Sequence, residues 1–546
     1  MKALLAALLV TATVPAVAQQ MPVPAAPAPS PAAKAPPKLL VVISVDQFSA
    51  DLFAQYRDKF TDGFARLLQG AVFPSGYQSH AATETCPGHS TILTGVHPAT
   101  SGIIANTWLD QKVGRADKLV YCAEDERVPG SNHDDYTPSD LHLKVPTLGD
   151  LMKRANPASR VVSVAGKDRA AIMMGGHNTD QIWFWNGKTV ATLAGRPANP
   201  VADRTNQAVA ALIAQPQTAL PVPGYCARLM QGIAIGSQTL GAGRFERAAG
   251  DAKAFRASPA LDGAVFAMAA GFIQDMKLGQ GAATDLIAIG ASATDYVGHA
   301  YGPGGGEMCV QLAQLDATIG AFFATLDGWN IDYEVVLTAD HGGHDATERQ
   351  QTRAMPMETR VSTDVSAKAV GAAIGKTLGI AGPVLLSSDG DLYVSNDVPA
   401  AKRDAVIAET VRRFKAMPQI AAALTAKEIA ATPMPHTPPE TWTLTERARA
   451  SFYPGRSGDV LLLLKPRVTG IPTPGPGYVA THGSPWDYDR RVPILFWRKG
   501  MAGFEQPLSV ETIDIAPTLA ATIGLPVTGM EGRCLDLDGG SGDSCR

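Results

Sequence analysis

Short apolar runs recur along the chain and are separated by longer segments with helical periodicity. Six of them are predicted strands: Leu39–Val45, Arg160–Gly166, Leu286–Gly290, Glu334–Ala339, Asp459–Leu464 and Val492–Trp497. Most of these runs are continuous rather than alternating, which is typical of parallel strands covered by helices on both faces. The pattern predicts an α/β fold, an α/β/α sandwich with a largely parallel central sheet.

The pattern changes over residues 346–454, which combine a predicted strand, Asp391–Asn396, with an amphipathic helix, Ala400–Met417. We interpret this region as an inserted cap. It would divide the core into a first part, residues 38–345, and a second part that includes the C-terminal tail, residues 455–546.

The first 37 residues have the features of an export signal followed by a linker. Lys2 precedes the apolar run Leu4–Val10 and an Ala-Val-Ala cleavage site, which predicts a signal peptide over residues 1–18. The run is shorter than the ~20 residues of a membrane span. Residues 19–37 form a Pro/Ala-rich linker. No later window is apolar enough to suggest a span in the mature chain, so we expect a periplasmic or secreted bacterial protein.

Composition limits the partners. The 546 residues are 45% hydrophobic and carry a formal net charge of -4, without a long basic run. These values indicate an ordinary globular protein and give no reason to expect nucleic acid binding. The six cysteines allow up to three disulfides, and no CxxC motif is present. Cys534 and Cys545 are close together in a polar tail, so we expect them to pair.

Polar residues follow three of the predicted strands. Asp46 ends the first run, Asp295 follows Leu286–Gly290, and Asp340-His341 follow Glu334–Ala339. Open α/β sheets bind ligands beyond the carboxyl ends of their strands, where loops from separate strands converge. We therefore expect these three loops to form one site.

Several of these residues are candidate metal ligands. The set is Asp46, Asp295, His299, Asp340, His341 and His482. The four-residue spacing of Asp295 and His299 can place both side chains on one side of a helical turn. Carboxylate and imidazole ligands suit zinc or manganese. Taken singly, each Asp is more typical of a helix N-cap and each His of a solvated loop; their coincidence at three strand ends favours a metal site.

The segment TETCPGHST, Thr83–Thr91, has the composition of a helix start. Proline favours the first helical turn, so a helix should begin near Cys86-Pro87 and end at Gly95. Thr85 then lies at the helix N-terminus. It is either a plain N-cap or a nucleophile, because a helix N-terminus favours an alkoxide and an incoming phosphate.

Two neighbours of Thr85 also carry reactive groups. Cys86 is a rival nucleophile, since a helix N-terminus favours a thiolate. Hard oxygen ligands nearby and export to an oxidising compartment argue against it. His89, one turn further on, either braces the site or packs in the core or on the surface.

In their order along the chain, these motifs resemble those of the alkaline phosphatase superfamily. The resemblance covers residues 38–534 and rests on Asp46, the T-x-T-x-P-G-H motif around Thr85, Asp295-x-x-x-His299, Asp340-His341 and His482. Asn106 in GIIANTW, and Lys167 and Arg169 in VAGKDRAAI, resemble the phosphate-binding set of bacterial alkaline phosphatases with a threonine nucleophile. The related type I phosphodiesterase/nucleotide pyrophosphatases share the metal ligands and the Asn but lack the Lys-x-Arg pair. Seen alone, Lys167 and Arg169 would be typical of a solvated loop.

The resemblance implies a two-zinc hydrolase of small phosphate monoesters. It implies one zinc on His482, Asp295 and His299, and a second on Asp46, Asp340, His341 and Thr85. It further implies that Thr85 attacks phosphorus to give a phosphothreonine, and that Asn106, Lys167 and Arg169 hold the nonbridging oxygens. The chain departs from the classical alkaline phosphatases in using Thr for Ser, and no carboxylate set matches their third, magnesium site.

Other functions stay open at this point. A phosphodiesterase or nucleotide pyrophosphatase would use the same metal ligands, and a non-catalytic periplasmic protein would bind phosphate or metal without turnover. An arylsulfatase is disfavoured, because Gly and His follow Cys86-Pro87 where its modification motif needs other residues. Zinc is implied by the resemblance, and manganese or mixed occupancy are alternatives. Oligomeric state and physiological substrate are not predicted.

Overall fold

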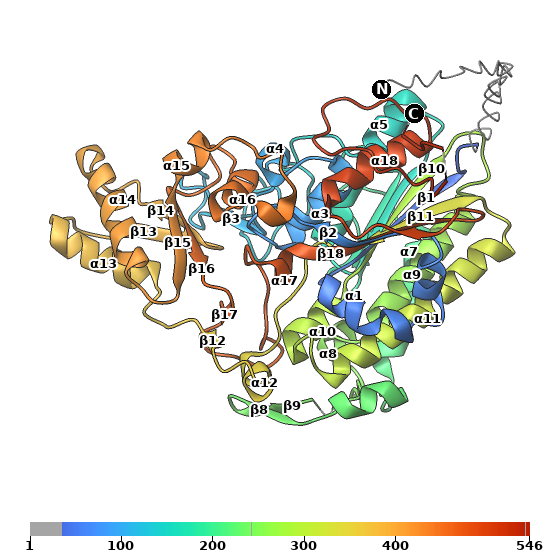
Figure 1. Ribbon diagram of the computed structural model, residues 1–546, viewed down its shortest axis with the longest axis horizontal. Helices are drawn as coiled ribbons and strands as arrows, with labels where there is room; N and C mark the ends of the chain where they lie inside the picture. Colours follow the sequence, from blue (N-terminus) through green and yellow to red (C-terminus); the bar gives the residue numbers. More distant parts are fainter. Residues whose placement is uncertain (1–34, 242, 541, 546) are drawn as a thin grey trace, which may run out of the picture. The chain divides into compact units, whose positions relative to one another are not determined.

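The computed structural model describes residues 35–241, 243–540 and 542–545 (Figure 1). The predicted signal peptide and most of the predicted linker lie outside the described residues. The described residues belong to one compact unit.

A 10-stranded sheet with the order β19-β2-β18-β11-β1-β10-β5-β6-β7, and with β20 beside β2, forms the centre of the fold. Its strands are β1 (Leu39–Val45), β2 (Ala71–Tyr77), β5 (Val161–Ala165), β6 (Gln181–Trp185), β7 (Val190–Ala191), β10 (Asp285–Ala291), β11 (Tyr333–Thr338), β18 (Arg491–Arg498), β19 (Phe504–Glu505) and β20 (Val510–Glu511). The five strands from β11 to β6 run parallel. β18 pairs antiparallel with β11 and β2, and β7 pairs antiparallel with β6. The predicted α/β sandwich with a largely parallel sheet is confirmed.

Helices cover both faces of this sheet. One face packs against α1 (Ala50–Tyr56), α2 (Gly63–Leu67), α7 (Pro200–Ala214), α9 (Pro259–Asp275) and α11 (Gly306–Gly328). The other packs against α3 (Thr85–Thr94), α5 (Leu148–Ala155), α6 (Asp168–Gly175) and α18 (Ile515–Thr522). All seven residues of β1 are buried, with Val41 and Ile43 toward the first set of helices and Leu40 and Val42 toward the second. This two-sided burial explains why the central strands are continuous apolar runs.

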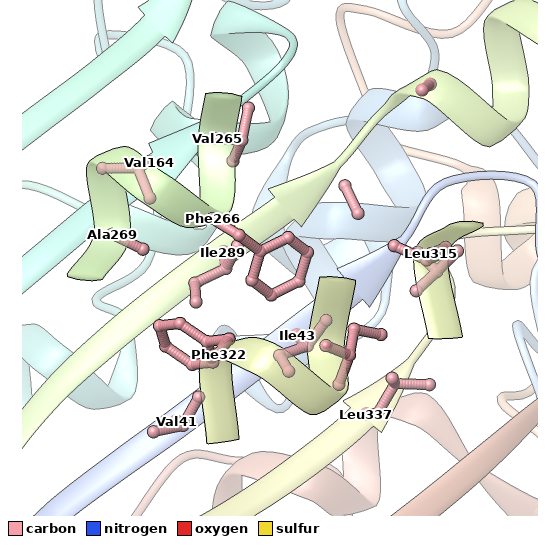
Figure 2. Close-up of a cluster of buried hydrophobic side chains, with 14 of the residues drawn as sticks. Val41, Ile43, Val164, Val265, Phe266, Ala269, Ile289, Leu315, Phe322 and Leu337 are labelled. Carbon is pink, nitrogen blue, oxygen red and sulfur yellow. The ribbon is translucent and has the colours of Figure 1, made fainter. Parts of the chain in front are cut away.

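Aromatic side chains fill the core beneath the first face. Phe266 of α9 and Phe322 of α11 lie over Val41 and Ile43, with ring centroids 5.4 Å apart in an edge-to-face arrangement (Figure 2). Burying two phenyl rings against β-branched side chains removes a large apolar area from water. The cluster thus holds two long helices firmly under the strands whose ends carry the polar residues.

Helix α11 is long enough, and apolar enough over one window, to cross a membrane by length and composition. This differs from the expectation that no later window is apolar enough to suggest a span. In the structure, more than half of the window is buried inside the fold, and the helix packs on α9, α2 and α10 (Ala293–Tyr301). Its apolar character is that of a core helix.

A second, antiparallel sheet with the order β13-β14-β16-β15 is built from residues 385–464, most of which belong to the region interpreted as an inserted cap. It comprises β13 (Leu385–Ser388), β14 (Asp391–Val394), β16 (Val460–Leu464) and β15 (Ile420–Thr425), with α13 (Ala367–Leu378) and α14 (Ala400–Lys415) packed against it (Figure 1). The strand and helix predicted within the insertion are confirmed as β14 and α14. The prediction that Asp459–Leu464 is a strand of the central sheet is wrong, because β16 pairs with β14 and β15 instead. The small sheet therefore uses a strand from beyond residue 454.

Smaller elements connect these layers. The short strands pair as β3 (Thr107–Leu109) with β4 (Leu119–Tyr121), β8 (Ile233–Ile235) with β9 (Gln238–Leu240), and β12 (Thr359–Arg360) with β17 (Val468–Thr469). The remaining helices are α4 (Pro98–Ser101), α8 (Ala252–Arg256), α12 (Thr347–Thr352), α15 (Ala426–Ala431), α16 (Leu444–Ser451) and α17 (Asp487–Arg490). Four 3₁₀ turns are η1 (Arg57–Lys59), η2 (Gly224–Leu229), η3 (Pro439–Thr441) and η4 (Thr512–Asp514).

Candidate active site

The polar residues predicted to converge do meet at the carboxyl ends of neighbouring strands. Asp46 follows β1, Asp340 and His341 follow β11, and Asp295 lies in the first turn of the helix after β10. Lys167 comes two residues after β5. Because β11, β1, β10 and β5 are consecutive neighbours in the sheet, their ends place all of these side chains in one region.

Helix α3 brings Thr85 to the same place. The helix begins at Thr85, with Glu84 as its N-cap, and ends at Gly95, whose φ of 68° is left-handed. Thr85 is thus the first helical residue, and the interpretation of Thr85 as the N-cap is wrong. Gly88 explains how α3 comes so close to β11, since a Cβ at this position would lie 2.0 Å from the carbonyl oxygen of Asp340.

Two cations face the Thr85 hydroxyl, which is buried. The Nζ of Lys167 lies 3.4 Å from Thr85 Oγ1, and Nη2 of Arg169 lies 3.5 Å from it. His89, one turn along the helix, contacts the Thr85 carbonyl oxygen through Nδ1 at 2.9 Å and the Asp340 carboxylate at 3.1 Å. Of the two alternatives for His89, the structure shows the bracing one.

Cys86 cannot act as a free nucleophile, because it is bonded to Cys122. All six cysteines lie in the described residues and form three disulfides, the other two being Cys226–Cys309 and the predicted Cys534–Cys545.

The candidate metal ligands form two neighbouring clusters within the described residues. The ligand atoms of Asp295, His341 and His482 lie within 4.8 Å of one another, as do those of Asp46, His89 and Asp340. This grouping differs in detail from the one that the resemblance implies. His341 contributes to the first cluster, although its Nε2 also lies 3.2 Å from Asp340 Oδ2 and 3.6 Å from Asp46 Oδ1.

His299 belongs to the same region. Its Nε2 lies 3.3 Å from Asp295 Oδ1, and Nε2 of His482 lies 3.4 Å from the same oxygen. The structure therefore brings together the six Asp and His residues predicted as ligands, and it places His89 beside them.

Several ligand atoms of these clusters are buried without a hydrogen-bond partner. Both carboxylate oxygens of Asp46, Oδ1 of Asp295, Oδ2 of Asp340 and Nε2 of His341 accept or donate no hydrogen bond within the described part of the chain. Lys167 forms an ion pair with Asp46 Oδ2 at 2.7 Å, but one ammonium group cannot balance three buried carboxylates, and burying charge without enough partners costs several kcal/mol or more. Divalent cations bound at the two clusters would supply the missing partners, so the donor set fits a metal centre.

The histidine rings are oriented by the backbone. Nδ1 of His299, His341 and His482 each lies 2.8 Å from a carbonyl oxygen, that of Ala480, Gly342 and Thr83 respectively. A carbonyl oxygen can only accept a hydrogen bond, so Nδ1 is the donor and carries the hydrogen, and Nε2 of the neutral ring keeps its lone pair. This arrangement fixes the tautomer that binds a metal through Nε2.

Burial and neighbouring charges shift the pKa values of Asp46 and His341. Burial, then the charges of Asp340 and Asp295, raise the pKa of Asp46 well above its ordinary value, although Lys167 opposes them. Burial lowers the pKa of His341 to about 3, which keeps the ring neutral near pH 7. A neutral imidazole is the form that coordinates metal.

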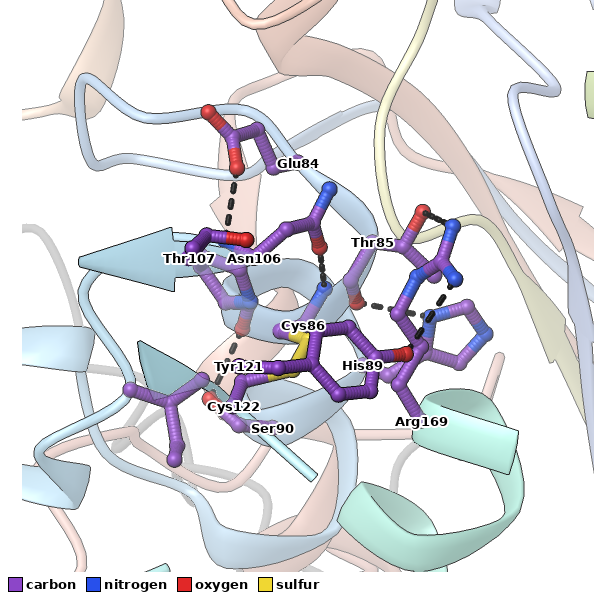
Figure 3. The surroundings of a disulfide bond; sticks show 12 residues. Glu84, Thr85, Cys86, His89, Ser90, Asn106, Thr107, Tyr121, Cys122 and Arg169 are labelled. Atoms are coloured by element: carbon purple, nitrogen blue, oxygen red, sulfur yellow. Dashed lines mark hydrogen bonds between the residues drawn. A yellow bond between two sulfur atoms is a disulfide. The ribbon is translucent and has the colours of Figure 1, made fainter. Parts of the chain in front are cut away.

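Asn106 and Arg169 lie near the N-terminus of α3 and face a cavity. The Asn106 Oδ1 accepts the backbone N–H of Cys86 at 2.9 Å, and Arg169 Nη1 lies 3.3 Å from the Tyr121 hydroxyl (Figure 3). That hydroxyl donates to Asp168 at 2.9 Å. The sequence analysis missed Tyr121, because nothing in the chain near residue 121 signals a contact with residues 168–169.

A cavity of about 590 Å³ opens beside these residues. On the side of the candidate metal ligands its walls include Asn106, Arg169, His299 and His482. On the other side they include apolar residues of β14 and β16, such as Leu462. The cavity therefore has one charged wall and one largely apolar wall.

Residues 40–485 match the type I phosphodiesterase/nucleotide pyrophosphatase family. The chain belongs to this family, which lies within the alkaline phosphatase superfamily. Two relatives are similar over almost the full chain. Alkaline phosphatase PhoK of Sphingomonas sp is 56% identical over 100% of this chain and 99% of its own. Alkaline phosphatase PhoD of Zymomonas mobilis is 48% identical over 93% of this chain and 89% of its own.

The fold agrees with these relatives. The crystal structure of wild-type alkaline phosphatase PafA superposes with a TM-score of 0.80 at 26% identity, covering 92% of this chain and 99% of PafA. Within its family, the chain is thus an enzyme of the alkaline phosphatase group, and the resemblance stated from the motifs is confirmed.

Proposed function

We propose that this chain is an exported alkaline phosphatase that hydrolyses small phosphate monoesters through a phosphothreonine at Thr85, in a site that holds two zinc ions. The observation that carries the proposal is the position of the Thr85 hydroxyl. It is buried at a helix N-terminus, within 3.5 Å of two cationic groups, and it lies beside the clusters of candidate metal ligands.

The candidate ligands would divide between two ions as in the related two-metal hydrolases. His482, Asp295 and His299 would hold one ion, and Asp46, Asp340, His341 and Thr85 the other. The buried oxygens without hydrogen bonds and the orientation of the histidine rings support metal binding by this set, and the contacts of His341 Nε2 with Asp340 and Asp46 are compatible with its place at the second ion. When bound, paired ions of this kind stabilise the attacking and leaving oxygens of an in-line displacement.

The chain's own groups would carry the substrate through the reaction. Thr85 Oγ loses its proton and attacks phosphorus, the phosphorus–oxygen bond to the leaving group breaks, and the leaving alkoxide takes up a proton and departs as the alcohol. A water molecule then attacks the phosphothreonine from the side opposite Thr85, the bond from phosphorus to Thr85 breaks, and inorganic phosphate and the reprotonated Thr85 hydroxyl result. Two displacements give net retention at phosphorus. The amide of Asn106 and the cations of Lys167 and Arg169 would hold the nonbridging oxygens throughout.

The two cations support a monoester rather than a diester. A terminal phosphoryl group has one more anionic oxygen than a diester, and Lys167 and Arg169 both point at the hydroxyl that would attack it. The family's own description makes a phosphodiesterase the second candidate. Substrate preference separates the two.

Export is supported by the three disulfides, since disulfides persist in oxidising compartments. The mass of the mature protein recovered from the periplasm or the medium tests it, with loss of residues 1–18 as the expected result.

Acid quenching during turnover tests the reaction itself. With a ³²P-labelled aryl phosphate and zinc-loaded enzyme, we expect up to one labelled phosphate per chain, recovered on the peptide that contains Thr85. Turnover of the monoester without label on that peptide would contradict a phosphothreonine intermediate.

A further inference from the structure

The Cys86–Cys122 disulfide joins two elements of the phosphate-binding region. Cys86 lies in the first turn of α3, directly after Thr85, and Cys122 follows β4, 36 residues further along the chain. Figure 3 shows the bond lying beneath Asn106 and Tyr121. Both sulfur-bearing residues are fully buried in an apolar cluster that also contains Ile104.

Both cysteine backbones also bind Asn106. The N–H of Cys86 donates to the side-chain Oδ1 of Asn106 at 2.9 Å, and the N–H of Cys122 donates to the Asn106 carbonyl oxygen at 2.9 Å (Figure 3). The N–H of Asn106 in turn donates to Glu84 Oε2 at 2.6 Å. Asn106 is therefore held by three hydrogen bonds, and the disulfide joins two of the residues that make them.

These contacts fix which end of the Asn106 amide faces the cavity. A backbone N–H needs an acceptor, so Oδ1 must point toward Cys86, and the Nδ2 group takes the opposite direction. The N–H of Cys86 is also one of the donors that the first turn of a helix leaves without a partner. Glu84, the N-cap of α3, makes no side-chain capping bond in the described structure. Asn106 caps the helix from outside and keeps its donor end for a ligand.

The disulfide is also connected, through Tyr121, to Arg169, the second group proposed to bind phosphate. Tyr121 directly precedes Cys122, and its hydroxyl accepts from Arg169 Nη1 at 3.3 Å while donating to Asp168 at 2.9 Å. The position of Tyr121 therefore links the disulfide to the Arg169 side chain.

We propose that the Cys86–Cys122 disulfide and Glu84 are positioning residues for phosphate binding: they hold the Asn106 amide, and through Tyr121 the Arg169 side chain, in a fixed position relative to Thr85. This inference rests on the proposed function, in which Asn106 contacts phosphate. Misplacing a contact group by about 1 Å can reduce the rate about 100-fold, so a covalent tie at this position has a direct effect on catalysis.

A double-mutant cycle tests the proposal. The zinc-loaded enzyme is compared with Asn106→Ala, with the double variant Cys86→Ser/Cys122→Ser and with all three substitutions combined, through kcat/KM for an aryl phosphate and the inhibition constant of inorganic phosphate. Cys534→Ser/Cys545→Ser, which removes the tail disulfide, is the matched control. We expect the Cys86/Cys122 variant to lower kcat/KM about tenfold or more and to raise the inhibition constant of phosphate by a similar factor. When Asn106 is already Ala, each change should be less than about threefold, the remaining effect being the one that acts through Arg169. The control should match the wild type.

The possible outcomes distinguish a failure of the proposed phosphate contact of Asn106 from a failure of the proposed positioning role of the disulfide. If Asn106→Ala leaves the inhibition constant of inorganic phosphate unchanged, Asn106 does not contact phosphate, and the role that the proposed function gives it is contradicted. If Asn106→Ala strongly reduces activity, but the cysteine substitutions reduce it by the same factor with and without Asn106, the proposal that the disulfide positions Asn106 is overturned. The proposed function then still stands. If the cysteine variant does not fold, Glu84→Ala replaces it in the same cycle, because it removes the bond to the Asn106 N–H and keeps the disulfide. The expected non-additivity is the same.

Discussion

The ammonium group of Lys167 lies 2.5 Å from the Asp295 carboxylate and 2.7 Å from that of Asp46. In the proposed division of ligands these two carboxylates belong to different metal ions. One buried cation thus stands between the two halves of the site and also within reach of the Thr85 hydroxyl. A group in that position can contact the phosphoryl oxygens and the leaving side of the reaction centre.

Replacing the nucleophile tests the role of Thr85. Thr85→Ala should lower kcat for an aryl phosphate by about 10⁴-fold or more, because no other hydroxyl takes its place. Thr85→Ser keeps a hydroxyl at the helix N-terminus and should retain measurable turnover. Thr94→Ala, at the other end of α3, is the control. Wild-type turnover by Thr85→Ala would exclude Thr85 as the nucleophile.

Metal content tests the ligand set. Dialysis against a chelator should abolish activity, and added zinc should restore it with a stoichiometry of two per chain. Asp46→Asn and Asp295→Asn should each bind about one zinc fewer, because each removes a charged oxygen from a different ion. Asp180→Asn, which alters a surface ion pair with Lys153, should bind as many as the wild type. Elemental analysis after gel filtration measures this. Full activity in the chelated enzyme would contradict the metal assignment.

Lys167 and Arg169 should set the preference for monoesters. Lys167→Ala and Arg169→Ala should each lower kcat/KM for a monoester by about 100-fold, as is usual when a transition-state contact is removed. The value for the corresponding diester should fall far less, because a diester lacks the extra anionic oxygen. Lys153→Ala serves as the surface control. An equal loss on both substrates would mean that the cations do not discriminate between them.

His97 should make stability depend on pH. Burial alone would lower the pKa of His97, but hydrogen bonds to Glu511 and Glu531 and their charges raise it to about 9. A pKa raised on folding stabilises the protein fully below about 6.5, and the contribution is lost as pH rises through about 9. Urea midpoints should therefore show His97→Gln destabilised at pH 6 and close to the wild type at pH 10. A destabilisation that is independent of pH would contradict this.

Much of the site could be predicted because it depends on strand ends. Asp46, Asp295 and Asp340 each follow an apolar run, and parallel strands bring their carboxyl ends together whatever the intervening loops do. The run Asp459–Leu464 led to an error for the same reason. Its composition is that of a central strand, and only the pairing with β14 and β15 shows that it belongs to the small sheet.

Contacts between distant segments could not be predicted. The pairing of Cys86 with Cys122 depends on the course of the hairpin between them, whereas Cys534 and Cys545 are close enough in sequence to suggest their bond. Similarly, a spacing of four residues places His89 on the same side of α3 as Thr85, but it does not show that Asp340 lies opposite.

The most direct test of the central proposal is kcat/KM for a nitrophenyl phosphate and for its bis-ester, measured on one zinc-loaded sample at alkaline pH. The account predicts a monoester preference of at least about 100-fold, from the two cations that face Thr85. A diester preference would contradict it, and would assign the enzyme to the phosphodiesterases of its family.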